Sequence, residues 1–156
     1  MTPAESHPSK LPTGTVTFLF TDIEGSTRLW EAHPEAMQDA LRSHDDLTTK
    51  HVEANNGTVF KHMGDGAIAA FASAGDAIDA ATALQAALAD HPHPDIGALR
   101  VRMGIHAGEV EERDGDYFGP TLHRTARLMA AGHGGQTLVS LVAARHAGDR
   151  EDLADL

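Results

Sequence analysis

Apolar and polar positions alternate over Thr15–Asp22, where Val16, Phe18 and Phe20 stand between threonines and Leu19. This period of two predicts a β-strand that is half-buried or nearly fully buried. The same kind of pattern predicts strands over residues 58–62, 67–71, 100–108 and 136–140. Residues 109–113 either pair with the strand over 100–108 or extend it.

Apolar positions three to four residues apart predict helices between these strands. A helix follows the first strand, is interrupted near His33-Pro34, and ends at Asn55-Asn56-Gly57. Three more helices are predicted over residues 74–90, 119–131 and about 141–146.

The order strand, helix, strand, strand, helix, strand is typical of an α+β fold, the ferredoxin-like split βαβ arrangement. It predicts an antiparallel sheet with helices on one face. The Asp65-Gly66 pair predicts a tight turn between the second and third strands. Because that hairpin neighbours the first strand in this fold, Asp22 at the end of the first strand and Asp65 are expected to meet.

At 156 residues the chain is expected to be one domain, residues 14–156, after a flexible segment 1–13 that contains three prolines. The net charge of −11 and the lack of a Lys/Arg-rich run argue against a nucleic-acid partner. With no cysteine, disulfides and thiolate metal sites are excluded. No apolar run has membrane-spanning length and no signal-peptide core is present, so we expect a cytoplasmic protein without membrane contact from this chain.

Asp22 and Asp65 come from different elements and together could clamp a divalent cation. A carboxylate pair without neighbouring histidine ligands favours Mg²⁺ or Mn²⁺ over zinc. The structural alternative is that Asp22 is a turn residue at a strand end and Asp65 a hairpin residue.

Four segments, in order, resemble the successive motifs of class III nucleotide cyclase catalytic domains, the adenylate/guanylate cyclase family, of the bacterial adenylyl cyclase type. The resemblance covers about residues 14–142. The segments are Phe20-Thr-Asp-Ile-Glu-Gly-Ser-Thr27, Phe60-Lys-His-Met-Gly-Asp-Gly66, Arg102-Met-Gly-Ile-His-Ala-Gly108 and Asp116-Tyr-Phe-Gly-Pro-Thr-Leu-His-Arg-Thr-Ala-Arg127.

The resemblance implies that Asp22, Asp65 and the carbonyl of Ile23 hold two Mg²⁺ or Mn²⁺ ions. It also implies a phosphate-facing turn, made by Gly25, Ser26 and Thr27. Many relatives have Phe at the Ser26 position.

Lys61 and Asp116 match the family's two base-reading positions. Lys61 offers donors and the Asp116 carboxylate offers acceptors, which complements the N1 acceptor and the 6-amino donor of adenine. Guanine presents the reverse order, so the pair favours ATP over GTP. The structural alternatives are a solvated strand lysine and a turn aspartate.

Arg127 matches the arginine that stabilises the transition state, and its structural alternative is an exposed or carboxylate-paired helix arginine. His123, one turn earlier, stands where the family commonly has the Asn that orients the ribose. The family's triphosphate-binding lysine is also missing, since Lys61 is the last lysine. Either the domain is truncated before its last strands or other groups, such as Arg124, hold the phosphates.

The implied protein is an adenylate cyclase that converts ATP to 3′,5′-cyclic AMP and pyrophosphate. The resemblance implies a head-to-tail homodimer in which one chain supplies the metal aspartates and its partner supplies Lys61, Asp116, His123 and Arg127. The alternative is a degenerate domain that binds nucleotide or dimerises with little catalysis. A diguanylate cyclase is disfavoured because the hairpin reads Gly64-Asp65-Gly66, and a hydrolase because no base for an attacking water stands out.

Overall fold

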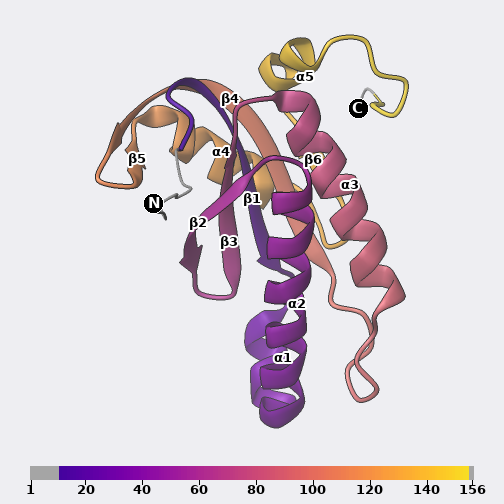
Figure 1. The fold of residues 1–156 in the computed structure, drawn as a ribbon. Helices are drawn as coiled ribbons and strands as arrows, with labels where there is room; N and C mark the ends of the chain where they lie inside the picture. Colours follow the sequence, from indigo (N-terminus) through magenta and orange to yellow (C-terminus); the bar gives the residue numbers. More distant parts are fainter. Residues whose placement is uncertain (1–10, 155–156) are drawn as a thin grey trace, which may run out of the picture.

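The computed structural model describes residues 11–154, and their elements follow the predicted order except for a short strand at Asp116–Phe118 that was not predicted (Figure 1). They are β1 (Gly14–Ile23), α1 (Ser26–Ala32), α2 (Pro34–Ala54), β2 (Thr58–Met63), β3 (Gly66–Phe71), α3 (Ala74–Asp90), β4 (Val101–Arg113), β5 (Asp116–Phe118), α4 (Pro120–Ala130), β6 (Thr137–Val139) and α5 (Leu141–Ala147). Residues 109–113 extend β4 and also pair with β5, which settles the alternative left open by the sequence.

The strands form one twisted sheet in the order β2-β3-β1-β4-β5, with neighbouring strands antiparallel. The last strand, β6, pairs with β4 in parallel, so the sheet is mixed. The α+β fold with a split βαβ core is confirmed. Because β1 lies between β3 and β4, it is the central strand, and its C-terminal end is flanked by β3 on one side and β4 on the other.

Helices cover both faces of the sheet, so the expectation of helices on one face was wrong. One face packs on α2, α3 and α5 through a large cluster that includes Leu19, Met37 and Leu84. The other face carries Phe18 and a second cluster that includes residues of α4. The physical reason is that β1 is apolar on both sides, so each side needs a cover.

Two glycines of β4 allow α4 to lie close to the sheet. A Cβ at Gly104 would lie 2.7 Å from the backbone nitrogen of Met129, and one at Gly108 would lie 2.6 Å from Oγ1 of Thr121. Any side chain at either position would therefore push α4 outward.

The predicted flexible segment 1–13 lies for the most part outside the described residues. At its end, Leu11 packs against the second cluster and the hydroxyl of Tyr117 donates to the carbonyl of Pro12 at 2.6 Å. The packed part of the chain therefore begins before residue 14. None of the helices in residues 11–154 combines the length and the apolar character needed to cross a membrane.

Candidate active site

The first part of the site lies where β1 ends. Ile23 is buried in the core and fixes the strand end, while the neighbouring Asp22 side chain stays partly exposed. Gly25 then adopts the left-handed conformation, with φ of 71°, and turns the chain into α1. The pocket formed here has a volume of about 380 Å³, and its lining residues are Asp22, Ile23, Gly25, Ser26, Thr27, Arg28, Glu31, Asp65 and Arg102. We call it the metal pocket.

Asp65 reaches this pocket because the β2–β3 hairpin is held tightly against β1. A Cβ at Gly66 would lie 2.2 Å from the carbonyl oxygen of Thr21, so only glycine allows this approach. The backbone N–H of Ala67 also donates to Oγ1 of Thr21 at 3.1 Å. The structure thus brings Asp22 and Asp65 to one pocket, together with the predicted turn Gly25–Thr27.

Arg102 is a residue of this pocket to which the sequence analysis assigned no role. It lies opposite Asp22 in the β1–β4 register, and its Nε and one terminal nitrogen donate to the two Asp22 carboxylate oxygens at 2.8 and 2.9 Å. These hydrogen bonds, opposed by a smaller effect of burial, raise the pKa of Arg102. The sequence placed opposite charges on two strands predicted to lie in one sheet, but only the register of β1 with β4 sets Asp22 and Arg102 face to face.

The donor set of the metal pocket fits magnesium or manganese. Asp22, Asp65 and Ile23 line it together, and carboxylate and carbonyl oxygens of the kind they could offer are hard ligands that suit those ions. Within residues 11–154, no group of three or more His, Cys, Asp or Glu side chains is arranged to hold a metal ion. A cation here would therefore need further oxygen ligands from water or phosphate.

Two arginines line the metal pocket, Arg28 and Arg102. Arg124, named above as a phosphate ligand in place of the missing lysine, is exposed on α4 and does not line this pocket. Within a single chain, the positive charge at this pocket thus comes from Arg102 of β4 and Arg28 of α1.

A separate, mostly apolar pocket of about 190 Å³ brings Lys61, Asp116 and His123 together, as the resemblance implied. We call it the base pocket. Lys61 forms an ion pair with Asp116, with 2.9 Å between Nζ and Oδ2. The remaining lining residues are Phe20, Phe60, Met63, Ile68, Leu122 and Ala126.

Asp116 is positioned from both sides. Its Oδ2 accepts from Lys61 and its Oδ1 accepts from the backbone N–H of Tyr117, and these two bonds hold the pKa of Asp116 below its ordinary value. Tyr117 is itself fixed by edge-on contacts with the rings of Phe18 and Phe60, at centroid distances of 5.1 and 5.0 Å. Burial also raises the pKa of the Tyr117 hydroxyl. The carboxylate is therefore ionised at neutral pH and held in a defined direction.

The helix α4 presents His123 and Arg127 outward. Its opposite side is fixed by Thr121, whose hydroxyl donates to the carbonyl of Glu109 at 2.8 Å, and by the fully buried Thr125. His123 lines the base pocket, whereas Arg127 is exposed and lines neither pocket. A single chain does not bring Arg127 to the metal pocket.

A polar link connects the loop beside the metal pocket with the loop after α4. Glu24 accepts from the backbone N–H of Gly134 at 3.0 Å, and Arg100 donates to the Gly134 carbonyl at 2.7 Å. Arg100 also lies 3.4 Å from the Glu24 carboxylate. The hydrogen bond from Gly134, more than the charge of Arg100, lowers the pKa of Glu24. The two loops are therefore held as one unit.

Comparison with known proteins identifies the family. Residues 9–149 match the family described as adenylate and guanylate cyclase catalytic domain. The chain is 43% identical over 132 residues to an uncharacterized protein of Mycobacterium tuberculosis, covering 83% of this chain and 44% of that protein. It is 34% identical over 154 residues to an adenylate cyclase of Podospora anserina, covering 83% of this chain and 7% of the fungal protein. The chain thus spans less than half the length of these curated relatives.

Solved structures show the same fold. A Trypanosoma brucei adenylate cyclase in its monomeric state superposes with a TM-score of 0.79 at 28% identity, over 88% of this chain and 77% of that one. An adenylate/guanylate cyclase/hydrolase from Silicibacter pomeroyi gives a TM-score of 0.73 at 29% identity, over 88% and 82% of the two chains. With the family match spanning most of the chain, this protein belongs to the class III adenylate and guanylate cyclase catalytic domain family.

Proposed function

We propose that this domain is an adenylate cyclase, which converts ATP to 3′,5′-cyclic AMP and pyrophosphate at the interface of a head-to-tail homodimer. The observation that supports this most is the Lys61–Asp116 ion pair at an apolar pocket. It offers a donor beside an acceptor where a flat base can be enclosed.

Base selection follows from these two side chains. Lys61 would donate to N1 of adenine and Asp116 would accept from the 6-amino group. Guanine would instead present its N1–H donor to Lys61 and its O6 acceptor to Asp116, so neither hydrogen bond could form. A mispaired buried polar group costs on the order of 1–3 kcal/mol, which corresponds to about tenfold discrimination or more.

A two-chain site is supported by how the residues are distributed. The metal pocket and the base pocket share no lining residue, and Arg127 lines neither of them. In the proposed dimer the metal pocket of one chain faces the base pocket and α4 of the partner. A two-fold axis would then create two equivalent sites.

The reaction proposed is an in-line displacement within one ATP molecule. The ribose 3′-oxygen forms a bond to the α-phosphorus, the bond to the pyrophosphate oxygen breaks, and the 3′-hydroxyl proton passes to Asp22 or to water. Mg²⁺ or Mn²⁺, when bound, would lower the pKa of the 3′-hydroxyl and neutralise charge on the leaving pyrophosphate.

The chain's own residues would supply position and charge. Asp22, Asp65 and the Ile23 carbonyl would hold the cations, and Gly25, Ser26 and Thr27 would lie along the phosphates. Arg127 from the partner chain would stabilise charge developing on the α-phosphoryl group, because its guanidinium stays protonated. His123 would contact the ribose.

The test is incubation with ATP or GTP and either Mg²⁺ or Mn²⁺, followed by chromatography of the products. We expect cyclic AMP from ATP and little cyclic GMP, with no product from an Asp65→Asn variant. Nucleotide binding without turnover under any of these conditions would support the degenerate domain instead. A linear monophosphate as product would show hydrolysis and contradict the proposal.

A further inference from the structure

The strand β2 has a break in its register where it borders the base pocket. Its pairing with β3 shifts between Val59 and Lys61, as at a β-bulge, and Phe60 stands outside the register. Such a break re-aims side chains, because it interrupts the alternation of the strand. Phe60 and Lys61 are neighbours in sequence, yet both line the base pocket, which a regular strand would not allow. An apolar wall and a hydrogen-bond donor thus share one pocket.

Alternation resumes after the break and brings a second apolar side chain to the pocket. Met63 lies two residues beyond Lys61 and lines the base pocket with it, whereas His62 between them does not. Of the apolar residues that line this pocket, Met63 is the exposed one, and the others are buried or half-buried. Met63 therefore has the most free apolar surface at the pocket.

The exposure of Met63 has a local cause. Its relative exposure is 63%, whereas Met37 and Met103 are fully buried. Its cross-strand partner is Gly66, which must be glycine because of its close approach to the backbone of Thr21. Side chains on paired strands normally pack on each other across the ladder. Met63 has no such partner, so its thioether lies uncovered at the rim of the pocket.

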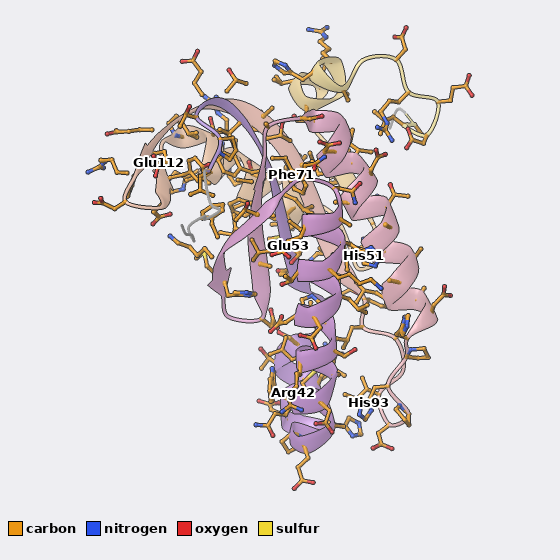
Figure 2. All side chains as sticks on the ribbon, viewed as in Figure 1. Arg42, His51, Glu53, Phe71, His93 and Glu112 are labelled. Atoms are coloured by element: carbon orange, nitrogen blue, oxygen red, sulfur yellow. The ribbon has the colours of Figure 1, made fainter. Side chains whose placement is uncertain are left out.

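The polar groups of the pocket come from both ends of the strand order. Lys61 of β2 and Asp116 of β5 lie 2.9 Å apart, although these strands are the first and last of the order. The long arm of β4 that carries β5 therefore returns toward β2. Glu112, labelled in Figure 2, marks this arm, which lies on the same side of the view as β2.

A base held by Lys61 and Asp116 would still have two flat faces to cover. Hydrogen bonds to the edge of a base act in the plane of its ring, so they leave the faces open. Apolar side chains must cover them. A methionine suits this task, because its side chain is flexible and its sulfur makes favourable contacts with aromatic rings.

We propose that Met63 packs on one face of the nucleotide base and sets how tightly the base is held. This inference rests on the proposed function, which places the base of ATP between Lys61 and Asp116. Met63 contacts the ring face and reads no edge, so it holds adenine and guanine alike. The choice between the two bases stays with Lys61 and Asp116.

The test uses 3′-deoxy-ATP with Mg²⁺. A nucleotide without the 3′-hydroxyl cannot cyclise, so binding is measured without turnover. The protein carries ¹³C in its methionine methyl groups, and the Met63 signal is the one absent from Met63→Leu protein. We expect 3′-deoxy-ATP to shift this signal, since an aromatic ring alters the magnetic field over its face. Inorganic triphosphate, which has no base, should leave the signal in place.

Variants measure the contribution of Met63 to binding. Met63→Ala should weaken 3′-deoxy-ATP by roughly three- to tenfold, since an apolar contact with the ring is lost, and Met63→Leu by less than about twofold. Leu141→Ala is the matched control, because Leu141 is 65% exposed and lies outside the base pocket. It should bind 3′-deoxy-ATP as the parent does, and all three variants should bind inorganic triphosphate as the parent does.

The guanine analogue separates a contact with the ring face from a reading of the ring edge. Met63→Ala should weaken 3′-deoxy-GTP and 3′-deoxy-ATP by the same factor, so the ratio of their affinities stays that of the parent. Parent-like binding of 3′-deoxy-ATP by Met63→Ala, or a Met63 signal that does not respond to bound 3′-deoxy-ATP, would overturn the proposal. A signal that responds to protein concentration and not to nucleotide would place Met63 against a second chain and overturn it too.

The outcomes also distinguish this inference from the proposed function. Protein that binds 3′-deoxy-ATP with a shifted Met63 signal, yet makes no cyclic AMP from ATP, supports the role of Met63 and contradicts the cyclase activity. Protein that makes cyclic AMP while the Met63 signal stays unshifted does the reverse. A parent protein that binds no 3′-deoxy-ATP would contradict both.

Discussion

Arg102 of β4 donates hydrogen bonds to both carboxylate oxygens of Asp22 on the neighbouring strand β1, at 2.8 and 2.9 Å. The two side chains are 29% and 28% exposed, so the ion pair is partly shielded from solvent. A cation that binds Asp22 must compete with this guanidinium. Once displaced, Arg102 remains in the same pocket, where it can face phosphate oxygens.

We therefore expect Arg102→Gln to bind Mn²⁺ more tightly than the parent in the absence of nucleotide, by roughly three- to tenfold, since a charged hydrogen-bonded competitor is lost. Cyclase activity should fall in the same variant, because the pocket loses one of its two arginines. Electron paramagnetic resonance of free Mn²⁺ measures the first effect. Arg42→Gln, which removes an exposed arginine of α2, is the control, and weaker Mn²⁺ binding by Arg102→Gln would contradict this prediction.

Complementation between inactive variants tests the two-chain site. Asp65→Ala and Arg127→Ala should each be inactive alone. Mixing them should restore about one quarter of the parent activity, because statistical exchange makes half of the dimers mixed and each mixed dimer has one intact site.

The control for this experiment pairs two changes in the same half of the site. Asp22→Ala mixed with Asp65→Ala should recover no activity, since no mixed dimer would contain an intact metal pocket. Failure of the first mixture, with mixed dimers present, would show that each site is built within one chain.

Lys61→Glu tests base selection. The change places a second carboxylate beside Asp116 and removes the donor for adenine N1, so ATP turnover should fall at least about tenfold while the ratio of GTP to ATP turnover rises. Product formation from an equimolar mixture of the two nucleotides measures this ratio directly. Lys50→Glu, at an exposed position on α2, makes the same charge change away from the pocket and should leave the ratio unaltered.

His123→Asn tests the position where this chain departs from its family. An imidazole changes charge near neutral pH and differs from an amide in reach, so the parent should be slower and more dependent on pH than the variant. Rates measured from about pH 5 to pH 8, a range that brackets the ordinary histidine pKa of about 6.5, decide the matter, with His146→Asn as a control. A parent that is faster than His123→Asn and flat with pH would refute the prediction.

Gly104→Ala tests the close packing of α4 on β4. The added methyl group would meet the backbone of Met129, and we expect a loss of about 1–3 kcal/mol in the free energy of unfolding. Denaturant titration measures it. Gly75→Ala is the control, because a Cβ there meets only ordinary contacts at 3.6 Å, so stability should be unchanged or higher. Equal free energies of unfolding for the two variants would show that α4 shifts to accommodate the added methyl group without a loss of stability.

Much of this molecule was predictable from local patterns. The order and approximate bounds of the strands and helices followed from periodicity, and the fold placed Asp22 and Asp65 at one pocket. Lys61, Asp116 and His123 came together as the family resemblance implied. The order of elements and the meeting of Asp22 with Asp65 were predictable because they depend on local periodicity and on neighbouring strands. The contact between Lys61 and Asp116 joins β2 and β5, at opposite ends of the strand order, and only the resemblance implied it.

The features that were missed depend on contacts between distant segments. The apolar character of both sides of β1 was visible, but placing α4 on the second face requires the path of the long β4–β5 arm. The Arg102–Asp22 bond requires the residue-by-residue register of two strands some 80 positions apart in the chain. Among the residues that the structure describes, the Nε2 of His44 is buried without a hydrogen-bond partner, which is a property of three-dimensional packing that no linear pattern reveals.

The position of Tyr117 beside the base pocket also has an optical consequence. The single tryptophan, Trp30, lies in α1 directly after the metal-pocket turn, while the single tyrosine, Tyr117, follows Asp116 at the base pocket. Each half of the proposed site therefore has its own intrinsic chromophore a few residues away in the chain, although neither side chain lines a pocket. Tryptophan emission and tyrosine absorbance should report the filling of the two halves separately, in the unlabelled protein.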